Sequence, residues 1–180
     1  NLDVNLKAFG ELLELGNVKV VAITHVSNVT GTVVPVKDIA SRAHAIGALV
    51  LVDAAQSVRH EEVDVQEIGC DFLCFSGHKV CAPTGIGVLW GKRSLLDALS
   101  PIEFGGEMVD IVTTSKTTFE ACPLRFEAGT PNFVGAIALG SALAYLLDLG
   151  LPEIREREHA LIDYAEKCLG KVPGLAVLGK

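Results

Sequence analysis

Polar side chains follow three apolar runs of the sequence, each at the point where the run ends. The three groups are His25 and Asn28, then Asp53 and Gln56, then Ser76, His78 and Lys79. In a parallel sheet the carboxyl ends of the strands lie along one edge, where ligands of open α/β folds bind. An acid, a lysine, histidines and several hydrogen-bonding groups at one edge are more than a folded core requires. This edge is therefore the predicted functional site.

Lys79 and Asp53 together suit pyridoxal phosphate (PLP). A lysine that forms a Schiff base needs a neutral amine and an electrophilic carbonyl. An aspartate beside a pyridine nitrogen keeps that nitrogen protonated, which makes the ring an electron sink. Ser76 and His78 flank the lysine and have donors for a phosphate, and Gln56 has a donor for the ring hydroxyl.

Four of the candidate residues also have a simpler interpretation. Lys79 could lie on a surface turn, Asp53 could cap a helix, and His78 could be a structural histidine. For His25 the residue types leave a structural and a catalytic role open, and we keep it as a candidate catalytic residue. The convergence of the three groups favours the cofactor roles.

Alternating strands and helices position these residues. Apolar, β-branched runs predict strands at 18–24, 48–52, 72–76 and 85–90, the first of them covered on both faces. Helical spacing predicts helices at 2–16, 35–45, 94–99, 133–149 and 152–169, while 105–118 reads as a long flexible loop. This pattern predicts an α/β sheet with right-handed crossovers. The direction of the fourth strand is left open, because only a tight turn precedes it.

Composition narrows the function classes. The 180 residues are 49% hydrophobic and 21% charged, which excludes disorder for most of the chain. The net charge of −7 argues against a nucleic-acid surface. No apolar segment is long enough to cross a bilayer. The five cysteines have no zinc-type spacing, so we expect no metal site and reduced thiols in a cytoplasmic protein.

Four segments carry a family resemblance, and they occur in the family's order. They are THVSN at 24–28, VDAAQS at 52–57, SGHK at 76–79 and RFEAGTPN at 125–132. Together they resemble the class V aminotransferases and, within that family, the SufS-type (group II) cysteine desulfurases. Each segment alone is weak, but their order and spacing run through almost the whole chain.

The resemblance implies a three-layer α/β/α sandwich with a mainly parallel sheet, the major domain of the type I fold of PLP-dependent transferases. It implies that Lys79 binds PLP covalently and shuttles protons. Asp53 would pair with the pyridinium nitrogen, and Gln56 would contact the ring oxygen.

The remaining roles also come from the resemblance. Ser76 and His78 would bind the cofactor phosphate, and Asn28 would lie beside the substrate carboxylate. Thr130 would reach across a homodimer interface to the phosphate of the partner's cofactor.

The chain lacks one functional residue that the resembled family has. The family's sulfur-accepting cysteine lies on a loop downstream, and none of the five cysteines matches it. We therefore expect a fragment, inactive alone, in which 1–172 is the central part of the PLP-binding large domain and 173–180 begins the small domain. The parent would convert L-cysteine to L-alanine and pass the sulfur, as a persulfide, to a protein cysteine for iron–sulfur cluster assembly.

Two alternatives to a cysteine desulfurase remain. Another class V enzyme, such as an aminotransferase or a selenocysteine lyase, would use the same cofactor residues. A non-catalytic binding or dimerisation module would fold without attaching PLP to Lys79.

Overall fold

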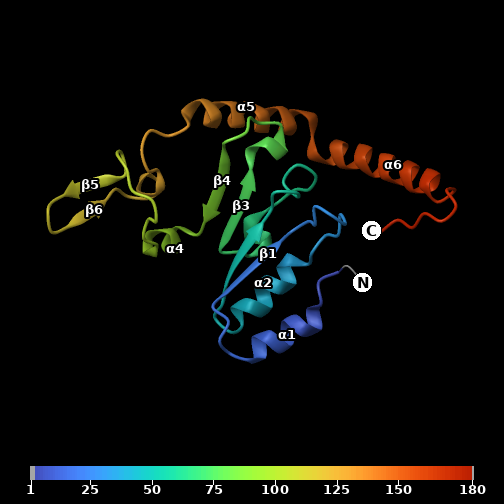
Figure 1. Ribbon diagram of the computed structural model, residues 1–180, viewed down its shortest axis with the longest axis horizontal. Helices are drawn as coiled ribbons and strands as arrows, with labels where there is room; N and C mark the ends of the chain where they lie inside the picture. The colour runs from blue at the N-terminus through green and yellow to red at the C-terminus, as the bar shows by residue number, and fades with distance from the viewer. Residues whose placement is uncertain (1–2, 180) are drawn as a thin grey trace.

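The computed structural model describes residues 3–179 and contains a four-stranded sheet (Figure 1). Its strands follow the order β1-β2-β3-β4: β1 (Val20–Thr24), β2 (Leu49–Asp53), β3 (Phe72–Ser76) and β4 (Gly87–Gly91). The first three strands are parallel, and β4 is antiparallel to β3. The expected α/β fold with a mainly parallel sheet is confirmed.

Six α-helices and two 3₁₀ turns accompany the strands in the described residues. They are α1 (Leu6–Glu14), α2 (Val36–His44), α3 (Val65–Ile68), η1 (Gly77–Val80), α4 (Arg93–Ala98), η2 (Leu124–Phe126), α5 (Phe133–Leu149) and α6 (Leu151–Leu169). Five of the helices were predicted. The short helix α3 was missed, although Asp64 caps it by accepting hydrogen bonds from the Gln66 and Glu67 N–H groups.

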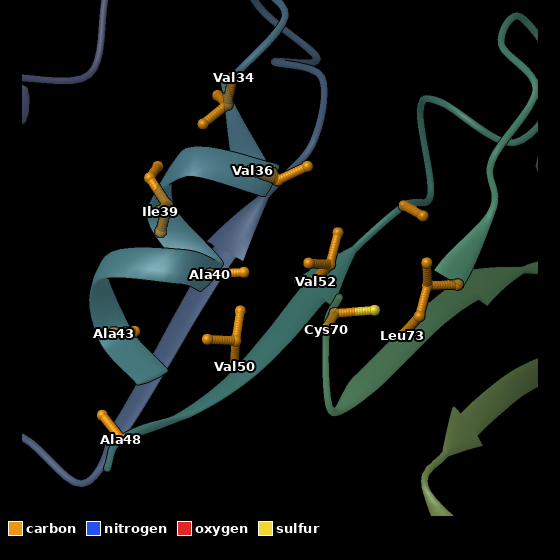
Figure 2. Packing of buried hydrophobic residues seen from close by; sticks show 11 residues of the cluster. Val34, Val36, Ile39, Ala40, Ala43, Ala48, Val50, Val52, Cys70 and Leu73 are labelled. Carbon is orange, nitrogen blue, oxygen red and sulfur yellow. The ribbon is translucent and has the colours of Figure 1, made fainter. Parts of the chain in front are cut away.

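The main core lies between α2 and the central strands (Figure 2). Val50 and Val52 on β2 are completely buried against Ile39 and Ala43 of α2. Burying one such valine contributes about 1.5–3 kcal/mol. Because side chains alternate along a strand, this contact fixes which face of β2 points to the helix.

Strand β4 runs antiparallel because the connection before it is short. Only residues 77–86 separate β3 from β4, whereas a parallel crossover needs a dozen or more residues. Phe75 pairs with Val88, and both contact a second cluster formed by Val80 of η1 and Leu139 of α5. Helix α5 is thus held on the turn that joins β3 to β4.

Helices α2 and α5 both pack on the sheet face that carries Val52, Leu73 and Phe75. The other face is more open, and Val20 of β1 and Leu89 of β4 are more than half exposed. The prediction that the first strand is covered on both faces is therefore wrong for the described chain. Among residues 3–179, strand β1 pairs only with β2 and so lies at an edge of the sheet.

Residues 105–118 do not form the expected irregular loop. They contain most of a hairpin, β5 (Val109–Val112) and β6 (Thr117–Phe119), which projects from the body in Figure 1. Thr113 closes its turn, since its N–H donates to the Lys116 carbonyl at 2.9 Å and its hydroxyl accepts from the Lys116 N–H. Threonine thus acts here as a strand and turn former.

The end of the described chain has little regular structure. Residues 175–179 form neither helix nor strand, and Lys180 lies outside the described residues. The predicted domain boundary at 172/173 stays a prediction. Within residues 3–179, no single helix has both the length and the apolar composition of a membrane span. Among these residues, α5 and α6 have that length and composition only when taken together, and the two helices are bent by 74° relative to each other.

Asp71 joins several elements at the end of the sheet away from the predicted site. The residue is 3% exposed. Its carboxylate accepts hydrogen bonds from the Val50 N–H and from Lys92 Nζ, both at 2.7 Å, and lies 2.8 Å from His44 Nε2. Burial alone raises the pKa of Asp71, but these hydrogen bonds outweigh it and hold the pKa below its ordinary value.

We expect Asp71→Asn to lower the free energy of unfolding by about 2–3 kcal/mol near pH 7. The reason is that the substitution removes the negative charge of the Asp71 carboxylate, which Lys92 and His44 contact. Because the folded-state pKa is depressed, this contribution is complete above the unfolded pKa of about 4 and is lost as the pH falls through the folded value. Urea unfolding at several pH values measures it.

Glu67→Gln is the matched control, because Glu67 pairs with Lys37 at an exposed site, with 3.3 Å between Nζ and Oε1. An exposed pair contributes little. Equal stabilities of the two variants at neutral pH would contradict the assignment of Asp71.

Candidate active site

The ends of β1, β2 and β3 meet at one edge of the sheet. Thr24 is in register with Asp53, and Asp53 with Cys74. The His25 N–H donates to the Asp53 carbonyl at 2.8 Å, which continues the ladder one residue past β1. The backbones of His25 and Asp53 are thus adjacent at this edge, while the proposed roles of their side chains stay predictions.

Asn28 and Gln56 are also brought together. They follow different strands, and Gln56 Nε2 donates a hydrogen bond to Asn28 Oδ1. The loop that carries Asn28 is closed locally, because Ser27 Oγ accepts from the Thr30 N–H at 3.2 Å. Two of the predicted site residues therefore form one polar unit.

Lys79 lies on η1, directly after β3. This turn packs tightly: a Cβ atom on Gly77 would lie 2.7 Å from Ile86 Cγ2 and 2.9 Å from the Ile86 oxygen. The Gly77 N–H donates to that same oxygen at 2.8 Å. Lys79 and Ser76 are partly buried, whereas His78 is exposed. Lys79 therefore lies partly buried on a tightly packed turn, rather than on the surface turn of the simpler interpretation.

The Asp53 carboxylate is only partly engaged. Oδ1 accepts the Ala55 N–H at 2.9 Å, and no donor within residues 3–179 reaches the other oxygen. The pKa of the neighbouring Cys74 thiol is raised, first by burial and then by the charge of Asp53. The simpler interpretation of Asp53 as a helix cap is wrong, because the residues that follow it form turns and the next helix, α3, begins at Val65. One oxygen of Asp53 accepts a hydrogen bond within this turn, and the second is available.

His25 has a buried nitrogen without a partner. Among residues 3–179, no group bonds to Nδ1. Burial lowers the pKa of His25, and the charge of Glu61 partly offsets this. A neutral imidazole with an unsatisfied nitrogen is compatible with both roles left open for this residue.

Thr130 lies apart from these groups. It is exposed, on the segment between η2 and α5, and its side chain makes no hydrogen bond to residues 3–179. Its role across a homodimer interface stays a prediction.

A cavity of about 760 Å³ opens beside Asn28 and Gln56. Helix α6 forms its other side and is attached to the segment after β2 by an ion pair between Arg155 and Glu61 at 2.9 Å and by a hydrogen bond between His60 Nδ1 and Glu158 Oε2 at 2.5 Å. Lys79 and Asp53 do not line this cavity. The helix was predicted, but its place beside the site was not, because the contacting residues are far apart in sequence.

The residues present fit PLP. An amine on a rigid turn, a carboxylate with an unengaged oxygen and an unpartnered buried imidazole nitrogen lie at the ends of neighbouring strands. No group of three or more metal-ligating side chains occurs among residues 3–179.

Comparison with known proteins agrees with this fold and site. Two solved structures have the type I fold of PLP-dependent cysteine desulfurases. Cysteine desulfurase CsdA from Escherichia coli is 42% identical, with a TM-score of 0.87 over 92% of this chain and 42% of its own. Apo cysteine desulfurase from Thermococcus onnurineus is 34% identical, with a TM-score of 0.88 over 97% of this chain and 48% of its own.

The family follows from the sequence comparison. The model of aminotransferase class V matches residues 1–180, so the chain belongs to this PLP-dependent family. The probable cysteine desulfurase of Halalkalibacterium halodurans is 54% identical over 161 residues, which are 89% of this chain and 40% of that protein. The chain therefore spans less than half the length of this relative.

The lowered pKa of His25 generates a prediction about acid stability. As the pH falls below about 6.5, the unfolded chain binds a proton at this site before the folded chain does. The free energy of unfolding of the unmodified protein, compared with that of His25→Asn, should therefore decrease as the pH falls from about 6.5 through the lower folded-state pKa. Urea unfolding at several pH values measures the difference.

Glu61→Gln should enlarge this loss, because the Glu61 carboxylate partly offsets the effect of burial. A stability difference between the unmodified protein and His25→Asn that does not vary with pH would contradict the assigned shift.

Proposed function

We propose that this chain is part of a cysteine desulfurase of the SufS type (group II). The proposed reaction takes L-cysteine and a protein thiol to L-alanine and a protein persulfide, and thus supplies sulfur for iron–sulfur cluster assembly. One observation carries the proposal. Asp53 ends β2 and Lys79 follows the adjacent parallel strand β3, in a class V chain whose relatives are named cysteine desulfurases.

Each residue has a proposed task. PLP, when bound, supplies an electron sink for charge that develops at the substrate Cα. Lys79 holds the cofactor covalently and moves the proton at Cα. Asp53 keeps a proton on the pyridine nitrogen with its unengaged oxygen. The short, rigid turn after β3 keeps the lysine in reach of this edge.

The polar groups around these two residues bind and orient. Gln56 is proposed to contact the ring oxygen, Ser76 and His78 the phosphate, and Asn28 the substrate carboxylate. The Gln56–Asn28 hydrogen bond supports this pairing, since it joins the cofactor side of the site to the substrate side. His25 is proposed as a further catalytic group at the same edge.

Residues outside this chain complete the proposed activity. The chain spans less than half the length of these relatives. Its five cysteines are unpaired: Cys70 and Cys122 are buried, Cys74 is partly buried, and Cys81 and Cys168 are exposed. We propose that the sulfur-accepting cysteine lies outside residues 1–180 and that the chain alone does not turn over L-cysteine. A homodimer, with Thr130 at the partner's cofactor phosphate, and a cytoplasmic location belong to the same proposal.

The covalent role of Lys79 is tested by trapping. The protein is incubated with PLP, reduced with borohydride and mapped by peptide mass spectrometry. We expect one labelled lysine, Lys79, and no label in Lys79→Ala. Lys116→Ala, at the exposed turn of the β5–β6 hairpin, should label as fully as the unmodified protein. Labelling of Lys79→Ala at the unmodified level would refute the proposal.

The role of Asp53 is tested in the complete protein. We expect Asp53→Asn to keep covalent PLP and to lose most of the L-alanine formation, because the neutral amide does not hold the ring nitrogen protonated. Quantifying alanine and persulfide from L-cysteine distinguishes desulfuration from amino-group transfer. A 2-oxo acid product in place of alanine would favour the class V alternatives.

A further inference from the structure

Asn132 uses both ends of its side-chain amide. Its Oδ1 accepts the Gly135 N–H at 2.9 Å and so caps the start of α5. Its Nδ2 donates to the Gly85 carbonyl oxygen at 3.1 Å. Gly85 lies 47 residues earlier, on the turn that follows Lys79.

Gly135 makes room for this arrangement. A Cβ atom at that position would lie 2.5 Å from Asn132 Nδ2 and 2.9 Å from Oδ1. The amide therefore occupies the space of a missing side chain on the first turn of α5.

The bonded carbonyl is close in the chain to the lysine turn. Ile86 follows Gly85, and its oxygen accepts the Gly77 N–H at 2.8 Å at the start of η1. On the other side of this turn, Val80 is fully buried with Leu139 of α5. The turn that carries Lys79 is thus connected to α5 by a polar contact at the helix start and an apolar contact further along it.

Capping alone does not require an asparagine. Serine, aspartate and asparagine cap helices about equally well, because each offers an oxygen acceptor. Of these three, only the asparagine side chain also carries N–H donors. Helix capping therefore does not account for the hydrogen bond from Asn132 to Gly85.

We propose that Asn132 is a positioning residue for the cofactor lysine. Its Nδ2–Gly85 bond fixes the Lys79 turn against the start of α5, and thereby against Thr130, two residues before the cap. This inference rests on the proposed function for the consequence at the cofactor. The connection itself concerns only residues of this chain.

Two substitutions separate the bridge from the cap. Asn132→Asp keeps the capping oxygen but turns a second oxygen toward the Gly85 carbonyl. Asn132→Ser keeps a capping hydroxyl that is too short to reach Gly85. Asn5→Asp is the matched control, because Asn5 caps α1 by accepting the Ala8 N–H at 3.0 Å and its side chain bridges to no other element in the described chain.

The first measurement is hydrogen–deuterium exchange in the complete protein without PLP. In both Asn132 variants we expect the Gly77 amide hydrogen to exchange about fivefold faster. This is the change in the local opening equilibrium that the loss of one hydrogen bond produces. The melting temperature should stay near that of the unmodified protein, because the cap remains. Asn5→Asp should leave the Gly77 amide unchanged.

The second measurement is the rate at which PLP leaves the loaded protein, followed as the borohydride-trapped fraction over time. We expect release to be about fivefold faster in both variants. Exchange and release at the unmodified rates in both variants would overturn the inference, as would equal acceleration by Asn5→Asp. If even the unmodified protein fails to attach PLP, the proposed function fails, and the exchange result still decides the role of Asn132.

Discussion

The register of β2 between its two parallel neighbours is the constraint on which the site depends. Val50 and Val52 are fully buried against α2, and a slip of one residue would turn both to the opposite face. The cost of that exposure holds Asp53 at the level of Thr24 and Cys74. The polar groups that follow these residues meet for the same reason, so the apolar core positions the candidate site.

The turn after β3 extends this positioning to the lysine. Gly77 donates a hydrogen bond to the Ile86 oxygen, and Asn132 donates one to the Gly85 oxygen. Both acceptors are backbone oxygens, so a substitution at Ile86 or Gly85 does not remove them. The buried Val80 joins the turn to α5. The lysine backbone is thus fixed from the strand, from its own turn and from a distant helix.

Local patterns predicted most of the fold and part of the site. The third strand and α5 have the expected bounds, because an apolar run and an asparagine cap are visible in a few consecutive residues. The β5–β6 hairpin was missed since its strands are short and largely exposed, and its Thr- and Ser-containing turn resembles a loop. The contacts of Asn132 with Gly85 and of His60 with Glu158 join residues 47 and 98 positions apart, and no local pattern encodes them.

The open face and edges of the sheet have a practical consequence. β1 and β4 each have one neighbour, and Val20 and Leu89 are exposed on the less covered face. Unpaired strand edges beside apolar surface are templates for pairing between chains. We therefore expect the isolated chain to self-associate as its concentration rises. Soluble yield, more than thermal stability, then limits what can be measured on the chain in isolation.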